Sequence, residues 1–188
     1  MQYPNWFQSS LRNFKNILDP YKNQPNLKFL QIGAYTGDAS IWLLDNILTA
    51  PSSTLVDVDT WAGSNEEIHK TFDWQDIESV YDERVSRFSN VKKYKGTSTE
   101  YLKSCNEQFD FIYIDGDHTA EGVYSDAVLS LPFLKTNGIL AFDDYLWKHD
   151  TKDIMLEPKA GIDRFLQENS DNIETIINDY QYWLRSLK

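Results

Sequence analysis

The sequence predicts an α/β domain built around a mostly parallel β-sheet. Short apolar strands alternate with amphipathic helices along the 188 residues, and no repeat or Gly/Ser/Pro-rich linker divides the chain. Glycine and acidic residues follow several of these strands, and ligands bind at the carboxyl ends of strands in open parallel sheets. With 41% hydrophobic residues, the chain can bury one sizeable core. We therefore expect a single domain over residues 1–188.

Composition restricts the class of partner. The chain has 18 basic and 29 acidic residues, a formal charge of −11, which disfavours nucleic acid and anionic membranes as partners. The lone cysteine, Cys105, cannot form an intrachain disulfide and suits a reducing compartment. Residues 1–20 contain neither a signal-peptide pattern nor an apolar run long enough for a membrane. A cytoplasmic location is expected.

Hydrophobic spacing gives the order of the elements. Apolar residues at helical spacing predict an N-terminal helix within residues 1–20 that Pro20 ends. Strands are predicted over 27–32, 54–58, 91–94, 109–114 and 139–142. Helices are predicted over 39–48 and 76–88, from Ser98, over 123–131 and over 160–168. Residues 27–150 form the expected core of the domain, and residues 158–188 add a helix and an antiparallel edge hairpin around Asn178-Asp179.

The loop after the first strand has two glycines four residues apart, Gly33 and Gly37. Gly33 permits a tight turn, and Gly37 would let a ligand approach the next helix. The phosphate-binding motif of dinucleotide sites needs a glycine where Tyr35 stands. The loop therefore suits a ligand with ribose and adenine but no pyrophosphate, although two ordinary turn glycines would give the same pattern.

The second strand ends in two carboxylates, Asp57 and Asp59. An acidic side chain at this position can accept hydrogen bonds from both ribose hydroxyls of a bound nucleoside. The sequence does not choose between the two, and solvated turn aspartates are the alternative.

The order of these motifs resembles the class I S-adenosylmethionine (SAM)-dependent methyltransferases over residues 27–150. The matching pieces are LQIGAYTG, VDVDTWAG, GTSTEYL, YIDGDHT and AFDDY. Within that class the chain is similar to small metal-assisted O-methyltransferases, including the catechol type and the macrocin-type sugar enzymes. The resemblance implies a Rossmann-like sheet of seven strands.

The resemblance also implies a set of cofactor-binding residues. Gly33 and Gly37 would flank the methionine part of SAM, Asp59 or Asp57 would hold the ribose, and Ser98 would lie against the adenine. Ala34, Tyr35 and Asp115 complete the cofactor set together with Gln31. The family usually has glutamate where Gln31 stands, facing the ammonium group of the cofactor, and glutamine keeps an acceptor but loses the charge.

Three carboxylates, Asp115, Asp143 and Asp144, end the fourth and fifth strands and are the predicted metal ligands. In the sheet of this family the two strands are adjacent, so the carboxylates could converge on Mg²⁺ or another divalent cation. The resemblance places metal ligands at the same three positions. Solvated loop acids are the alternative.

His118 is the predicted general base, because an imidazole titrates near neutral pH and follows Asp115 by three residues. A histidine bonded to a neighbouring carboxylate is the alternative. Asp117 could serve as the base instead, or cap the following helix. Trp61, Tyr145 and Trp147 are candidates for the wall of the substrate pocket or for the core, whereas His69 and His149 are expected at the surface.

These expectations predict a methyltransferase that modifies a hydroxyl of a sugar, polyol or phenol, with SAM and a divalent cation. A SAM-binding or hydroxylase-like relative without methyl transfer, and a nucleotide-dependent oxidoreductase, are the alternatives. A homo-oligomer is compatible with the sequence.

Overall fold

A computed structural model describes residues 3–64 and 66–188, and it contains one seven-stranded sheet. The strand order is β3-β2-β1-β4-β5-β7-β6, with parallel pairing throughout except where β7 runs antiparallel to β5 and β6. The strands are β1 (Lys28–Ile32), β2 (Thr54–Asp59), β3 (Val91–Lys95), β4 (Phe109–Ile114), β5 (Leu134–Phe142), β6 (Ile173–Asn178) and β7 (Tyr182–Ser186). The predicted Rossmann-like fold with its antiparallel C-terminal hairpin is confirmed.

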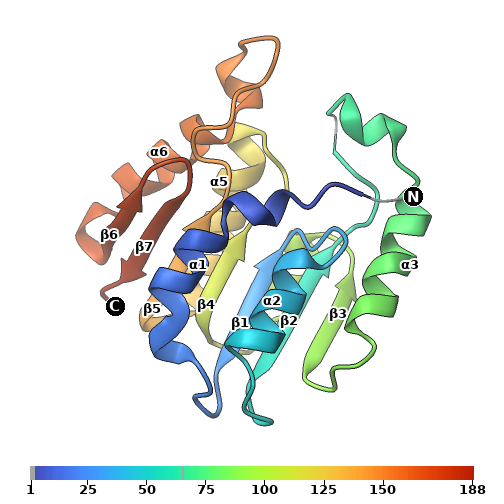
Figure 1. Ribbon diagram of the computed structural model, residues 1–188. Coiled ribbons are helices and arrows are strands. Elements are labelled where there is room, and N and C mark those ends of the chain that lie inside the picture. The colour runs from blue at the N-terminus through green and yellow to red at the C-terminus, as the bar shows by residue number, and fades with distance from the viewer. Residues whose placement is uncertain (1–2, 65) are drawn as a thin grey trace.

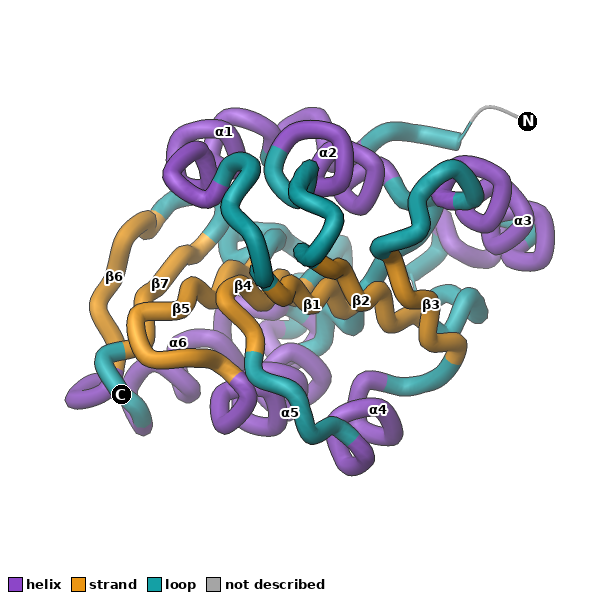
Figure 2. Tube along the Cα trace, turned by 90° about the horizontal axis from the view of Figure 1, so that it is seen from below, coloured by secondary structure: helices purple, strands orange, loops and turns teal. Residues whose placement is uncertain are grey.

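Helices cover both faces of the sheet. Figure 2 shows α1, α2 and α3 on one side and α4, α5 and α6 on the other. The helices are α1 (Leu11–Leu18), α2 (Asp38–Asn46), α3 (Trp74–Val85), α4 (Ser98–Ser104), α5 (Ala120–Ser130) and α6 (Pro158–Glu168). Short 3₁₀ turns include η1 (Trp6–Ser9), η2 (Asp19–Tyr21), η3 (Ile68–Thr71), η4 (Leu131–Phe133), η5 (Ile154–Leu156) and η6 (Ser170–Asn172). In the described ranges, no helix is long and apolar enough to cross a membrane.

The central strands are apolar on both faces because each face packs against helices. In β4, Phe111 and Tyr113 join the core under α1 and α2, whereas Ile112 and Ile114 join the core under α5 and α6. All four side chains are at most 2% exposed. Burial on both faces explains why the sequence of β4 is an almost continuous run of apolar residues.

Two boundaries differ from the sequence prediction. The N-terminal helix begins at Leu11 rather than near Trp6, and Pro20 lies inside the 3₁₀ turn that follows it. Trp6 remains 43% exposed and does not join the core. The fifth strand begins at Leu134, five residues before the predicted start, because the polar residues at its beginning gave no strand pattern.

β1 and β4 are neighbours in the sheet, although β2 and β3 lie between them in the sequence. The order in which strands are added to the sheet therefore reverses between β1 and β4. Ligands bind at such a switch point in α/β sheets. Two connections project beyond this edge in Figure 1: the segment between β2 and α3, in green, and the segment between β5 and α6, in orange. They flank the region where the polar strand ends meet.

Candidate active site

A cavity of about 790 Å³ lies over the carboxyl ends of β1 to β4. This volume falls in the range of small-molecule sites and can hold a cofactor together with a second ligand. Nine of the predicted site residues line it, namely Gln31, Gly33, Ala34, Tyr35, Asp59, Ser98, Asp115, Asp117 and His118. The other four, Gly37, Asp57, Asp143 and Asp144, do not line it.

Gly33 is required by the close approach of two loops. Its φ is +88°, and a Cβ atom there would lie 1.9 Å from the carbonyl oxygen of Asp115. Gly37 also has a positive φ, +80°, and caps α2, but a Cβ atom on it would meet the ring of Tyr81. Gly37 therefore serves the turn rather than the approach of a ligand, which corrects its expected role.

Asp59 fixes the shape of the glycine loop. Its Oδ2 accepts hydrogen bonds from the backbone N–H groups of Ala34 and Tyr35, at 2.7 and 2.9 Å, and its Oδ1 accepts one from Trp61 at 2.7 Å. These bonds hold the loop open above β1. The side chain stands at the end of β2, on the cavity wall.

Asp57 lies one layer below Asp59 and is fully buried. Its Oδ2 accepts a 2.8 Å hydrogen bond from the hydroxyl of Tyr81, and its Oδ1 has no hydrogen-bond partner among the described residues. Burial raises the pKa of Asp57 to about 7, and the nearby Asp59 adds to this, although hydrogen bonds from Ser40 and Tyr81 oppose the shift. Asp57 is thus a buried acid outside the cavity.

Ser98 begins α4 and donates a 2.5 Å hydrogen bond to Asp126 of α5. Both residues line the cavity at its β3 end. Burial raises the pKa of Asp126 to about 6, and the bond from Ser98 counteracts part of the shift. Ser98 and Asp126 therefore form a polar part of the cavity wall near β3.

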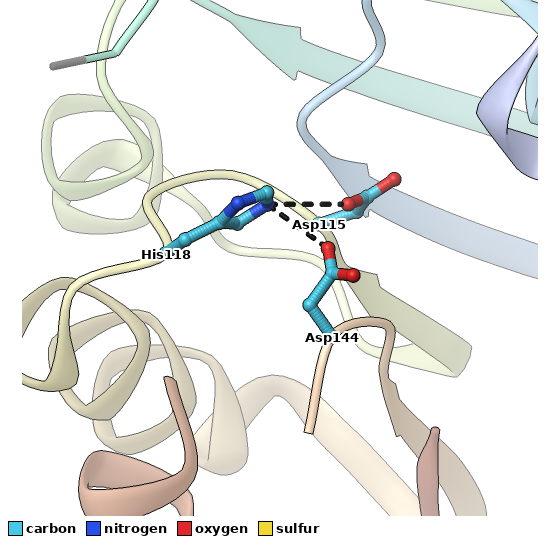
Figure 3. Close-up of side chains that lie close together, drawn as sticks. All are labelled: Asp115, His118 and Asp144. Carbon is cyan, nitrogen blue, oxygen red and sulfur yellow. Dashed lines mark ion pairs between the residues drawn. The ribbon is translucent and has the colours of Figure 1, made fainter. Parts of the chain in front are cut away.

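Asp115, His118 and Asp144 form the cluster shown in Figure 3, with one potential metal-ligand atom from each residue within 4.8 Å of the others. His118 Nε2 lies 3.1 Å from Asp144 Oδ2 and 3.8 Å from Asp115 Oδ1. The three side chains come from the loops after β4 and β5, which are adjacent in the sheet. Two carboxylates and an imidazole in this arrangement can hold a divalent cation.

A second layer of side chains orients the cluster. Tyr113 donates to Asp115 Oδ2 at 3.3 Å, and Tyr180 donates to Asp144 Oδ1 at 3.2 Å. Glu66, from the segment between β2 and α3, places Oε1 3.0 Å from His118 Nδ1, although not in hydrogen-bond alignment. Each of the three side chains in the cluster therefore lies next to a further polar side chain, as metal ligands commonly do.

Electrostatics in the cluster favours an added positive charge. Burial and the charge of Asp143 raise the pKa of Asp115 well above its usual value, against the opposing effect of His118. Burial disfavours the imidazolium form of His118, but Asp115, Asp144 and Glu66 outweigh it and raise its pKa well above the usual value. The carboxylates of the cluster thus favour a positive charge between them.

Asp143 stands apart from this cluster, contrary to the sequence prediction. Its Oδ1 accepts hydrogen bonds from Ser10, at 2.7 Å, and from Gln181. Gln181 in turn accepts a 2.8 Å bond from Asn13 of α1. Side chains of consecutive residues after a strand point in different directions, so Asp143 ties α1 to the C-terminal hairpin while Asp144 points toward His118.

The remaining predicted residues are divided between cavity and core. Asp117 is exposed and accepts a hydrogen bond from Thr119 N at 2.9 Å, but the N-cap of α5 is Thr119 rather than Asp117. Trp147 lines the cavity, with its ring centroid 5.3 Å from that of His118. Trp61 and Tyr145 are buried in the core.

Several cavity residues gave no usable signal in the sequence. His69 and His149 were expected at the surface, yet both line the cavity. Glu66 lies in a loop without periodicity, and Trp6 was assigned to a helix face. In the fold Trp6 stacks on Tyr35, at 4.8 Å between ring centroids, and lines the cavity too. Asp126 could have been suspected, because a carboxylate on the buried face of a helix needs a polar partner.

The raised pKa of Asp57 predicts a pH-dependent stability cost. The unfolded carboxyl ionises near its ordinary value of 3.8 and the folded one only near 7, so the free energy of unfolding should fall as pH rises between these values and then level off. Asp57→Asn should remove this decline, and its stability advantage should be larger at pH 8 than at pH 4. Urea unfolding at both values tests this, with the exposed Asp19→Asn as control. Equal differences at both pH values would contradict it.

Comparison with known proteins identifies the family. A model of the methyltransferase-domain family Methyltransf_24 matches residues 30–145. The uncharacterized protein R132 of Acanthamoeba polyphaga mimivirus is 24% identical over 137 residues, which are 72% of this chain and 57% of the viral protein. The chain thus covers less than two thirds of that relative's length.

Solved structures share the fold. The O-methyltransferase NovP superposes with a TM-score of 0.69 at 17% identity, over 95% of this chain and 80% of NovP. The O-methyltransferase from Bacillus cereus, in complex with S-adenosylhomocysteine (SAH), superposes with a TM-score of 0.62 at 17% identity, over 100% of this chain and 93% of the Bacillus protein. With the family model covering the strands and loops that build the cavity, the chain belongs to this methyltransferase-domain family and has the fold of SAM-dependent methyltransferases.

Proposed function

We propose that this protein transfers the methyl group of SAM to a hydroxyl of a small molecule, with a divalent cation at Asp115, His118 and Asp144. The observation that carries the proposal is that the glycine loop lines the same cavity as Asp115 and His118, two members of the Asp/His/Asp cluster. The solved structures that share the fold include O-methyltransferases, two of them described as complexes with SAH or SAM. The family match favours methyl transfer over nucleotide-dependent oxidoreduction.

The order of the strands supports one orientation of the cofactor. Along the edge of the sheet, Ser98 follows β3, Asp59 ends β2, Gly33 follows β1 and Asp115 follows β4. Adenosine would lie over β3 and β2, where Asp126 and Asp59 offer acceptors for amino and hydroxyl groups. The methionine part would lie over β1, with its sulfur toward the cluster.

The residues of the cluster fit a divalent cation. Two carboxylate oxygens and an imidazole nitrogen are suitable donors, and the nitrogen favours Mn²⁺ or Fe²⁺ over Mg²⁺ in affinity. Asp115, His118 and Asp144 would hold the ion, which would supply a positive charge that favours ionisation of the acceptor hydroxyl. The acceptor oxygen would attack the methyl carbon of SAM while the carbon–sulfur bond breaks and sulfur leaves as a neutral thioether.

Only one ring nitrogen of His118, Nε2, faces the two aspartates of the cluster, so it can serve either as a metal ligand or as the general base. Nε2 faces Asp115 and Asp144, whereas Nδ1 faces Glu66. If Nε2 binds the cation, it cannot accept the hydroxyl proton, which then passes to water. The carboxylate behind Nδ1 favours the ligand role, because metal-binding histidines usually have such a partner. We therefore assign His118 to the metal and keep the general base as the alternative that a variant can separate.

The lining of the cavity restricts the acceptor. Among the described residues that line it there is no lysine or arginine, whereas seven or more are acidic, including Asp38, Glu66 and Asp117. Phosphorylated and carboxylated acceptors would be repelled. Trp147 offers a flat apolar surface beside His118, and Trp6 offers another over the glycine loop, where it stacks on Tyr35. A neutral ring that carries hydroxyl groups, a sugar or a phenol, fits these walls.

A screen of acceptors tests the proposed function. The protein should release SAH from SAM in the presence of a neutral hydroxylated ring and Mn²⁺, and the phosphate ester of the same acceptor should react far more slowly. SAH can be quantified by chromatography. SAM binding without release from any sugar, polyol or phenol would favour the noncatalytic alternative, and no SAM binding at all would refute the proposal.

Metal binding separates the two roles of His118. Mn²⁺ should raise the melting temperature of the wild type, because it binds the native state, and both Asp144→Asn and His118→Ala should abolish the shift. His149→Ala, a cavity histidine outside the cluster, should retain it. If His118→Ala keeps the Mn²⁺ shift but loses activity by roughly two to four orders of magnitude, His118 is the base. A wild type insensitive to Mn²⁺, Mg²⁺ and chelator would contradict the metal site.

Glu66 should act through His118. Glu66→Gln removes the charge behind Nδ1, and we expect metal affinity to fall by about 10- to 100-fold. Glu67→Gln changes the neighbouring, exposed carboxylate, which pairs with Lys70, and is the matched control. Titration of Mn²⁺ by calorimetry measures both variants, and equal affinities would remove Glu66 from the site.

A further inference from the structure

One buried acid has no role in the site described above. Asp57 is completely inaccessible, and only one of its two oxygens has a hydrogen-bond partner in the described part of the chain. A buried carboxylate without a cation is costly. The fold places this one directly beneath the glycine loop, at the position in β2 that pairs with Gln31 of β1.

The cationic side chains around Asp57 are engaged elsewhere. Lys93 is its register partner in β3, but the ammonium group lies 2.7 Å from both Glu78 and Asp82. Arg84, on α3, bonds to Asp38 and to the carbonyl oxygen of Thr36. The other groups that face Asp57 are neutral or acidic: Tyr81, Ser40, Gln31 and Asp59. Residues 3–64 and 66–188 therefore supply no compensating charge next to Asp57.

Gln31 lies between Asp57 and the cavity. The two side chains are on the same face of adjacent parallel strands, about 5 Å apart. Gln31 lines the cavity, donates a 2.8 Å hydrogen bond to the carbonyl oxygen of Gly33, and accepts a weak bond, 3.5 Å, from Ser40. Ser40 also stabilises the ionised form of Asp57. A polar chain thus links the buried acid to the wall of the cavity over β1.

We propose that Asp57 is the counter-charge for the ammonium group of the bound cofactor, acting through Gln31 from the adjacent strand. The inference rests on the proposed function, because it takes SAM as the cofactor and places its methionine part over β1. A cation interacts with a buried charge more strongly than with a solvated one, because the effective dielectric constant of the protein interior is lower than that of water. Asp57 is then a positioning residue that does not touch the cofactor, and the neutral Gln31 makes the contact.

The test compares two ligands that differ in the charged part. SAH carries the ammonium group, whereas 5′-methylthioadenosine has the same adenosine and no amino-acid moiety. Asp57→Asn should weaken SAH binding by about tenfold or more and leave methylthioadenosine binding unchanged, as measured by calorimetry. The exposed Asp19→Asn should alter neither. Asp57→Ser serves as a second uncharged variant if the asparagine variant does not fold.

Restoring the charge on the neighbouring strand separates an electrostatic from a structural role. Gln31→Glu in the Asp57→Asn background should recover the preference for SAH over methylthioadenosine. An unchanged preference in Asp57→Asn, or equal losses for both ligands that Gln31→Glu does not recover, would overturn the proposal. A wild type that binds neither ligand would instead refute the proposed function.

Discussion

The parallel pairing of β1 with β2 on one side and with β4 on the other positions the groups of the candidate site. It brings the glycine loop, Asp59 and the Asp115 loop to one edge, although they are separated by up to about 80 residues in sequence. The pairing leaves so little space that Gly33 cannot carry a side chain beside the carbonyl group of Asp115. The glycine loop and the loop that carries Asp115 are therefore in direct backbone contact.

Negative charge is the second constraint on the site. The cavity and the layer beneath it contain Asp57, Asp115, Asp126 and Asp144, and burial raises the pKa values of the first three. In a chain with a net charge of −11, these acids have few protein cations to pair with. A divalent cation and a positively charged cofactor would supply the missing charge. The proposed metal and the proposed role of Asp57 are two consequences of the same electrostatic imbalance.

The segments that project from the sheet complete the cavity. Glu66 and His69 come from the connection after β2, and Trp147 and His149 come from the connection after β5. The N-terminal turn adds Trp6, which stacks on Tyr35 of the glycine loop. The proposed cofactor region is thus built mainly from strand ends, whereas the proposed acceptor region is built mainly from loops. Such a division lets loops vary the acceptor while the sheet keeps the cofactor site.

Local sequence predicted most of the strands and helices, the family resemblance added the seven-stranded sheet, and several predicted cofactor-binding residues line the cavity. Apolar periodicity predicted the strands and helices because buried positions require apolar residues. In β4, which is buried on both faces, nearly every residue is apolar. Gly33, Asp59 and Ser98 were found from their places at strand ends, which a parallel sheet brings together. The hairpin of β6 and β7 was predicted in the same way from its turn residues.

Tertiary structure decided which side chains face the cavity. Asp143 and Asp144 are adjacent and chemically identical, and only the direction of each side chain separates the bond to Ser10 from the cluster with His118. Asp57 and Asp59 share one face of β2, yet their depth in the sheet makes one a buried acid and the other a loop anchor. Glu66 reaches His118 across the cavity from a segment without periodicity. The sequence determined the strands and the chemistry at their ends, whereas depth, direction and contacts between distant loops arise only when the chain packs.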